Sequence, residues 1–420
     1  MKQAASLERA RTRAGARDRI RVVTLVDKLS VQGGAEHLAL MAATRLDRKR
    51  FDSILCISRW PPPARDMDMQ AQHAALARLE RTGTRFLPLR RRRKLELAAW
   101  ARLALFLRRE RVDVLHTHKF GSNVWGTIAG SAARVPVLLA HEHTWSYEGQ
   151  PLRRFLDREL IARRADRFIA VSREDQRRMI AVERVDPART LFVPNGIPAA
   201  PVPTGRDVRA ELGIAPGAAV VGTVGVLRAQ KAHHVLLRAA SELARDGSAL
   251  TVLIAGQGPE RGAIESLARE LGIADRVHLL GFREDVSDVL AALDVAVSCS
   301  DFEGSPLAVM EYMEAARAIV ATAVGGVPDL IDDGVHGLLV PPEDSHALAA
   351  AIGSLLADPQ RARTLGENAR ARRRSEFDID TFVHRLENLY EELLEQNRGL
   401  GGGARGVPRG ARARGASDGR

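Results

Sequence analysis

Short apolar segments alternate with helical stretches along almost the whole chain, and this alternation constrains the fold more than any other feature. The expected strands are residues 20–26, 54–57, 86–89, 112–116, 137–140 and 168–171, followed by 220–226, 250–255, 277–280, 295–297, 319–321 and 338–340. Such an alternation is typical of a parallel sheet with helices on both faces. We therefore expect an α/β protein with two tandem, doubly wound, Rossmann-like domains and an interdomain cleft.

Length and turn signals divide the chain. With 420 residues and 45% apolar composition, it is too long for one ordinary hydrophobic core. A turn signal, Pro194-Asn195-Gly196, precedes a proline-rich stretch. The expected organisation is a disordered basic tail (1–19), an N-terminal Rossmann-like domain (20–197), a linker (198–205), a C-terminal Rossmann-like domain (206–376), a final helix (377–396) and a disordered Arg/Gly tail (397–420).

The positive charge of the chain belongs mostly to its two ends. The formal net charge is +11, but residues 1–19 hold six basic and two acidic residues, and residues 398–420 hold six basic and one acidic. Aromatic residues make up 4% of the chain, too few for the stacking platforms of a nucleic-acid binder. We therefore expect no nucleic-acid partner.

Cysteine usage and hydropathy predict a cytoplasmic protein. Cys56 and Cys299 are the only cysteines, and both lie in strand-like runs typical of core thiols. No apolar run approaches the roughly 18 residues of a membrane-spanning helix, and the N-terminus lacks the apolar region of a signal peptide. Five cations at 90–94 lead into apolar residues that include Trp100. That segment predicts a core-facing helix or, alternatively, peripheral contact with an anionic membrane at its inner face.

The segment from Asp301 to Glu311 carries the most chemical information. It follows an expected strand, and Ser305-Pro306 is the pattern of an N-cap residue before a first-turn proline. The unpaired amides of a helix start suit a phosphate. Glu303 would lie in the loop beside that anion site, while Glu311, about a turn and a half into the helix, could accept hydrogen bonds from hydroxyls. The alternative is an ordinary capped helix with a solvated Glu311.

Two further elements follow expected strands, where ligands bind in open parallel sheets. Gly33 and Gly34 begin a helix and would let the backbone approach an anion or a sugar, unless they serve only a turn. Arg228 and Lys231 follow the first strand of the second series, and two cations suit two phosphates, although a solvated turn is the alternative. Lys231 is the only lysine after Lys119 in a chain whose basic residues are nearly all arginine, which favours the phosphate role.

Two His-x-His pairs, His116/His118 and His141/His143, each place two imidazoles on one face of a strand. Four imidazoles could hold a metal, which would suit a metal-dependent hydrolase. However, no acidic or cysteine ligand stands beside them at a recognised spacing, so we expect no metal. Ser172 is expected to be a helix N-cap.

The string EGSPLAVME resembles the Glu-x7-Glu motif of the retaining glycosyltransferases of family four, which have the two-domain GT-B fold. The resemblance implies that Glu303 meets the donor hexose, Glu311 holds the ribose, and Arg228 and Lys231 hold the diphosphate. It also implies that His118 reaches the donor sugar and that the final helix crosses back to the first domain. Further implied donor contacts are Gly33, Gly34, Gly281, Arg283, Gly304, Ser305, Pro306 and Leu307, and the implied acceptor side is His141, Glu142, His143 and Trp145.

The chain departs from the family pattern at two places. Family members often have an aromatic residue and a glycine where this chain has Ser305 and Pro306, and they usually have glycine where it has Ala232. The first departure lies in the region implied to bind the donor hexose. The identity of that hexose, the nucleotide base and the acceptor therefore stays open.

The expected activity is a retaining, metal-independent transfer of a hexose from a nucleotide-sugar donor, uridine diphosphate (UDP) linked, to a glycan, lipid-linked or small-molecule acceptor. No cofactor is expected beyond the nucleotide-sugar co-substrate. The alternatives are a UDP-sugar 2-epimerase on the same fold, a non-catalytic sugar-nucleotide-binding protein, and the His-cluster metal hydrolase, because fold alone does not separate them.

Overall fold

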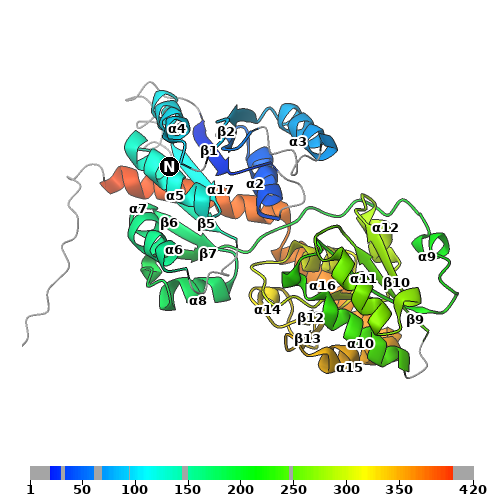
Figure 1. Cartoon of the computed structure of the whole chain (residues 1–420). Coiled ribbons are helices and arrows are strands. Elements are labelled where there is room, and N and C mark those ends of the chain that lie inside the picture. Colours follow the sequence, from blue (N-terminus) through cyan, green and yellow to red (C-terminus); the bar gives the residue numbers. More distant parts are fainter. Residues whose placement is uncertain are drawn as a thin grey trace, which may run out of the picture.

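The computed structural model describes residues 19–29, 34–60, 69–93, 95–143, 150–245 and 249–400, which form two parallel sheets, one in each half of the chain (Figure 1). The first sheet has the strand order β3-β2-β1-β4-β5-β6-β7 and the second has the order β10-β9-β8-β11-β12-β13. In each sheet the chain first adds strands on one side of β1 or β8 and then on the other, which creates a topological switch point there. Residues just beyond the carboxyl ends of the strands at such a point are well placed to bind ligands.

Apart from β7, which was not among the expected strands, the strands begin and end within three residues of the expected positions. They are β1 Ile20–Val26, β2 Phe51–Ile57, β3 Arg85–Pro88, β4 Val114–His118, β5 Val137–Glu142, β6 Arg167–Ala170 and β7 Thr190–Phe192, then β8 Ala219–Val224, β9 Leu250–Ala255, β10 Val277–Gly281, β11 Val295–Ser298, β12 Ala318–Thr322 and β13 Leu338–Val340. The α/β prediction of two doubly wound domains is confirmed.

Helices cover both faces of each sheet (Figure 1). In the first half they are α2 Gly34–Arg45, α3 Met69–Arg81, α4 Leu97–Arg109, α5 Phe120–Ala133, α6 Pro151–Leu156, the π-helical turn η2 Asp157–Ile161, α7 Ala162–Arg164 and α8 Arg173–Ala181. In the second half they are α9 Val208–Glu211, α10 His233–Arg245, α11 Arg261–Glu270, α12 Val286–Ala291, α13 Leu307–Glu314, α14 Val327–Leu330, α15 Ser345–Ala357, α16 Pro359–Glu376 and α17 Ile379–Leu400. The short 3₁₀ turns are η3 Pro187–Arg189, η4 Ala229–Lys231 and η5 Ala274–Arg276.

Each central strand of the second sheet buries side chains on both faces. Val221 packs with α10, α11 and α15 on one face, while its neighbour Val220 packs with α12 and α13 on the other. In β9, Ile254 packs in the first of these clusters and its neighbour Leu253 packs in the second. This period-two burial explains why the strands are continuous apolar runs in the sequence.

The last helix, α17, packs against the first sheet, although α16 before it belongs to the second half (Figure 1, orange-red). Phe382, Leu386 and Tyr390 of α17 are buried in one cluster with Val22 and Val114. The helix extends to Leu400, beyond the residue 396 that the sequence predicted. Residues 1–18 and 401–420, which make up most of the two predicted tails, lie outside the described residues.

The two segments that cross between the halves lie side by side. The backbone N–H of Ile197 donates to Phe377 O over 3.0 Å, and that of Ile379 donates to Ile197 O over 3.0 Å. A Cβ atom at Gly196 would lie 2.6 Å from Asp378 O, so this close approach excludes any side chain at that position. The buried Arg373 guanidinium donates to Ile197 O over 2.9 Å and fixes the junction.

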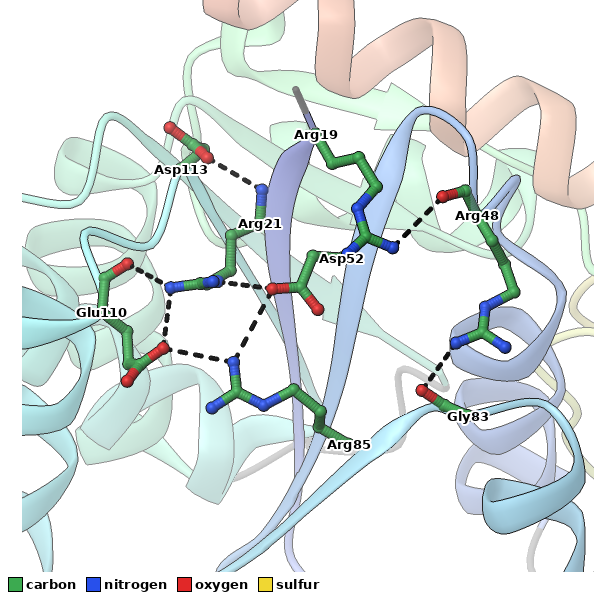
Figure 2. Close-up of polar contacts among 8 residues, drawn as sticks. All are labelled: Arg19, Arg21, Arg48, Asp52, Gly83, Arg85, Glu110 and Asp113. Carbon is green, nitrogen blue, oxygen red and sulfur yellow. Dashed lines mark hydrogen bonds and ion pairs between the residues drawn. The ribbon is translucent and has the colours of Figure 1, made fainter. Parts of the chain in front are cut away.

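A cluster of charged side chains joins the amino ends of the first strands (Figure 2). The Arg21 guanidinium lies 2.7 Å from a carboxylate oxygen of both Asp52 and Glu110, and Arg85 lies 3.2 Å from Glu110. The Asp113 carboxylate accepts a hydrogen bond of 2.8 Å from the Arg21 backbone. Pairs of this partly exposed kind each contribute about 1 kcal/mol or less. The cluster therefore stabilises the sheet at its amino edge, which is opposite the edge formed by the carboxyl ends of the strands.

The basic segment before α4 leads into a helix with a buried stripe. Trp100, Leu103 and Leu107 are buried, as the core-facing interpretation requires. Leu95 and Leu97, however, are 76% and 65% exposed, so the membrane-surface alternative stays a prediction. Within the described residues, none of the helices has the length and apolarity to cross a bilayer. Both cysteines are free and buried, which confirms the prediction of core thiols.

Candidate active site

Two predicted donor residues that are far apart in the sequence meet at the carboxyl edge of the second sheet. Lys231, in η4 after β8, places its Nζ 2.5 Å from Oε1 of Glu303, in the loop after β11. The Ser300 hydroxyl donates to the same carboxylate oxygen over 2.7 Å. Glu303 is 8% exposed, so its carboxylate is held by these two donors rather than by bulk water. A cation and a buried carboxylate thus form the centre of the site.

The second predicted cation, Arg228, is available for an anion. Its side chain is exposed and forms no hydrogen bond or ion pair with any described residue. It begins the turn that ends at Ala232, whose φ of 44° is left-handed. Glycine adopts that conformation without strain, which gives a physical reason for the glycine usual in the resembled family. The turn keeps its shape with alanine, and Arg228 and Lys231 both follow β8.

Helix α13 begins one residue later than predicted. Pro306, with φ −70° and ψ 114°, occupies the N-cap position and Leu307 is the first helical residue. The prediction that Ser305 caps the helix is therefore wrong. Because the ψ angle of Pro306 is extended rather than helical, the first helical dihedrals occur at Leu307. Ser305 instead uses its carbonyl oxygen, which accepts from Asn195 Nδ2 over 3.3 Å.

Glu311, the fifth residue of α13, is partly buried, and its carboxylate has no hydrogen-bond partner among the described residues. Burial raises its pKa to about 7. The alternative of a solvated Glu311 does not fit this environment. A carboxylate that is partly desolvated and unpartnered is suited to accept hydrogen bonds from ligand hydroxyls.

The loop that carries Glu303 is pressed against the first domain. A Cβ atom at Gly304 would lie 2.0 Å from the backbone oxygen of His143, and one at Gly34 would lie 3.4 Å from Leu307 Cδ1. Gly33 lies outside the described residues. Ser172 caps α8 as predicted, its hydroxyl accepting from Asp175 N over 3.0 Å. Gly304 and Leu307, two of the predicted donor residues of the second domain, therefore lie at the junction with the first.

The four histidines of the two His-x-His pairs gather on one face of β4 and β5. His118 Nδ1 is 2.9 Å from His143 Nε2, and His116 Nε2 is 3.2 Å from His141 Nδ1. The Tyr390 hydroxyl, from α17, is 2.7 Å from His116 Nδ1. Desolvation, reinforced by neighbouring charges, holds the pKa of His118, His141 and His143 well below the ordinary range, so the rings are neutral at pH 7.

Three of these four histidines are close enough to one another to be metal ligands, as the metal hydrolase alternative requires. Nitrogen atoms of His116, His118 and His141 lie within 4.8 Å of one another, and the described residues add no carboxylate or thiolate to the group. Several of these nitrogens already bond to each other or to Tyr390. The arrangement is that of a buried, hydrogen-bonded array, and the absence of a metal from the site stays a prediction.

Comparison with known proteins identifies the family. Residues 206–372 match the model for glycosyl transferases group 1, and residues 32–200 match the model for glycosyltransferase family 4. D-inositol 3-phosphate glycosyltransferase of Nocardia farcinica is 33% identical over 326 residues, which cover 72% of each chain. The chain belongs to the glycosyl transferases group 1 family. The α-D-kanosaminyltransferase of Streptomyces kanamyceticus is a further relative, 32% identical over 41% of this chain and 46% of its own.

Solved structures show that this group 1 glycosyltransferase has the GT-B fold. Anabaena Alr3699/HepE, crystallised with UDP-glucose, has a TM-score of 0.76 and 23% identity, and the match covers 89% of this chain and all of the other. Sucrose-phosphate synthase from Thermosynechococcus elongatus has a TM-score of 0.71 and 23% identity over 90% of this chain and all of the other. The predicted resemblance is confirmed at the level of family and fold.

Two further residues predicted to contact the donor, Gly281 and Arg283, lie at the end of β10 and just after it. Gly281, with φ 68°, ends β10 as expected for a turn near the nucleotide. The Arg283 guanidinium, however, is bound by Asp285 at 2.6 Å and Glu211 at 2.9 Å, and these carboxylates raise its pKa. The side chain of Arg283 is thus committed to an ion-pair cluster, which leaves its backbone for a ligand.

On the predicted acceptor side, Glu142 is buried at the end of β5. Its carboxylate lies 3.0 Å from the Arg153 guanidinium and 3.1 Å from the His143 backbone nitrogen. Desolvation, with the nearby Glu183 and Glu142 carboxylates, raises the pKa of Asp157 in the π-helical turn to about 9. Trp145 lies outside the described residues. The sequence signalled Glu142 but not its partner Arg153.

A separate pocket of the described structure lies away from this site. It has a volume of about 360 Å³ and lies at the amino ends of β8, β11 and β12, lined by Arg209, Arg317 and Arg363 among others. Arg209 donates to Ala292 O over 2.8 Å, and Arg317 donates to Leu293 O over 3.1 Å. These arginines bind the carbonyl groups that follow α12, which is a structural role. The site residues lie at the opposite, carboxyl edge of the sheet.

Proposed function

We propose that this glycosyltransferase moves a hexose from a UDP-linked donor to a hydroxyl of a glycan, lipid-linked or small-molecule acceptor, with retention and without a bound metal. The observation that carries the proposal is the ion pair between Lys231 and Glu303 at the carboxyl edge of the second sheet. Arg228 begins the turn that contains Lys231, and Glu311 lies in the helix that follows Glu303. The Anabaena structure with UDP-glucose, which shares the fold, supports the choice of donor.

Each group has a distinct part in the proposed reaction. Arg228 and Lys231 neutralise the diphosphate, Glu311 accepts hydrogen bonds from the ribose, and Glu303 and His118 contact the hexose. The bond from the anomeric carbon to the phosphate oxygen breaks, and a bond to the acceptor oxygen forms on the same face. The departing phosphate oxygen takes the acceptor's proton. The two cations stabilise the charge that grows on the leaving group, so no metal is required for that task.

The geometry makes the alternatives less suitable. An epimerase needs acid and base groups that are free to exchange protons, whereas Glu142 is buried and bound to Arg153. A protein that only binds sugar nucleotides would have no need for a buried carboxylate beside the phosphate cation, since that carboxylate opposes phosphate binding. The UDP-sugar 2-epimerase, the binding protein and the hydrolase are separable by experiment.

The first prediction is that the purified protein slowly hydrolyses one UDP-sugar, and that an excess of EDTA leaves the rate unchanged. Water replaces the missing acceptor, and cations of the protein take the place of a metal. A panel of uridine, guanosine, adenosine and thymidine diphosphate sugars would be followed by release of the nucleoside diphosphate. Saturable binding without release would support the binding protein, a new UDP-sugar epimer would support the epimerase, and Zn²⁺-restored hydrolysis would support the metal enzyme.

The second prediction concerns pH and Glu311. Its pKa of about 7 means that ribose binding, which requires the carboxylate, must first remove a proton at lower pH. The affinity for UDP should therefore fall by about tenfold for each pH unit below 7 and level off above it. Because the folded protein binds this proton more tightly than the unfolded chain, the ligand-free protein should lose stability as pH rises from about 4.5 to about 7.

The matched variant is Glu311→Gln, which resembles the protonated acid. Calorimetry at pH 5.5 to 8.5 should show weaker UDP binding in this variant, with the remaining pH dependence reporting the titration of the phosphate. A pH profile identical to that of the wild type would remove Glu311 from the nucleotide site.

A further inference from the structure

The geometry points to His143 as a positioning residue for the transfer reaction: it holds His118 in the tautomer that carries the proton on Nε2. This inference rests on the proposed function, in which His118 contacts the donor hexose. It also changes the expected role of His143, which the sequence placed on the acceptor side.

The two rings are joined through specific nitrogen atoms. His118, at the end of β4, and His143, just after β5, come from neighbouring parallel strands, and Nδ1 of the first lies 2.9 Å from Nε2 of the second. Nε2 of His118 is buried and has no hydrogen-bond partner among the described residues. A buried imidazole nitrogen without a partner is costly, so a ligand atom that satisfies it would be stabilised there.

Neutral rings must share a single proton in this bond. The neighbouring groups are His116 and His141, which are also neutral, and Lys119, whose ammonium lies 2.9 Å from Glu36. If His143 donates through its Nε2, then His118 Nδ1 accepts and the His118 proton is on Nε2. A sugar nucleotide offers hydroxyl and phosphate oxygens, which accept from such an N–H. The opposite tautomer would leave a lone pair on Nε2, which could accept from a hydroxyl but would repel a phosphate oxygen.

His143 also contacts the loop that carries Glu303. Its backbone oxygen lies where a Cβ atom of Gly304 would be only 2.0 Å away, so the two segments are in direct backbone contact. The residue that orients His118 in the first domain is therefore packed against the neighbour of Glu303 in the second. Through His143, the two side chains that the proposed function assigns to the hexose are placed relative to each other.

The test compares His143→Ala with His143→Gln. The alanine variant should lose about 10- to 100-fold in kcat, the range found when a hydrogen-bond partner that orients a metal-bound histidine is removed, with the donor KM and UDP affinity nearly unchanged. The glutamine amide can donate in place of Nε2–H and should recover most of that loss. Nitrogen-15 NMR of the ligand-free protein should show His118 protonated on Nε2 in the wild type, and a mixture of tautomers in His143→Ala.

The matched control is Tyr390→Phe, which removes the hydroxyl bonded to His116 at the other end of the array. It should lower the melting temperature while leaving the His118 tautomer and kcat unchanged. The inference is overturned if wild-type His118 carries its proton on Nδ1, if His143→Ala keeps wild-type kcat, or if alanine and glutamine cost the same. The NMR result does not depend on turnover. Failure of the proposed function would instead appear as an absence of UDP binding and of donor hydrolysis in the wild type.

Discussion

Replacing Lys231 with alanine is expected to weaken UDP binding by about ten- to a hundred-fold, because a charge-assisted hydrogen bond to phosphate contributes about 1.5 to 3 kcal/mol. Turnover should fall further. Charge grows on the leaving diphosphate as the glycosidic bond breaks, so a cation beside it stabilises the transition state more than the bound substrate. Calorimetry with UDP and steady-state kinetics would measure the two losses.

The structure adds a second consequence of the Lys231→Ala change. Glu303 would keep Ser300 as a hydrogen-bond donor but would lose its ion-pair partner while remaining 8% exposed. A buried carboxylate without its cation destabilises the fold, so the melting temperature should also fall. Arg228→Ala is the matched control, because the exposed Arg228 has no partner among the described residues and its removal should weaken binding without changing stability.

Lys231→Arg should recover part of the loss, since the planar guanidinium replaces a compact point charge and cannot reproduce the single contact of Nζ with Glu303. If Lys231→Ala binds uridine and guanosine diphosphates as tightly as the wild type, the donor site is elsewhere. The proposed placement of the reaction centre would then be wrong.

The fold could be predicted because the constraint is local and repeated. Residues such as Val220 and Val221, on opposite faces of β8, are both apolar because helices cover both faces, and this pattern recurs in strand after strand. The start of α13 was misplaced by one residue for an equally local reason. Serine is a good N-cap in most contexts, but the proline that follows Ser305 itself takes the N-cap position.

The candidate site residues were proposed one by one from motifs, and what escaped prediction is the set of contacts between segments far apart in the sequence. No pattern in the sequence shows that Gly304 touches the backbone of His143, or that Asn195 bonds to Ser305 O. The Pro194-Asn195-Gly196 signal indicated only a turn. Tyr390, on the final helix, has no motif that indicates its bond to His116. Such contacts join segments that are 110 or more positions apart, where local propensity carries no information.

The Lys231–Glu303 ion pair has a consequence for how the donor binds. The carboxylate competes with the diphosphate for the same ammonium group, so the free protein is not at its highest phosphate affinity. Binding of the diphosphate would draw Lys231 toward the phosphate and leave the Glu303 carboxylate, still held by Ser300, to interact with the hexose. The Lys231–Glu303 ion pair of the free protein would thereby be replaced by a contact of Lys231 with the phosphate and a contact of Glu303 with the hexose.

Glu303→Gln separates these two contacts and should differ in kind from Lys231→Ala. The amide removes the carboxylate charge but keeps an oxygen for Ser300, so UDP binding should stay the same or tighten slightly as Lys231 is released from its internal partner. Turnover should fall by about 10²- to 10³-fold, the usual cost of removing one preorganised electrostatic group from a transition state. Ser300→Ala, which leaves the charge but removes its hydrogen bond, should cost less than Glu303→Gln. Calorimetry and donor hydrolysis, measured in parallel, would decide the assignment. Glu303→Gln could instead lose UDP affinity as severely as Lys231→Ala while bound donor is hydrolysed at the wild-type rate. In that case Glu303 belongs to the phosphate site and a different residue contacts the hexose.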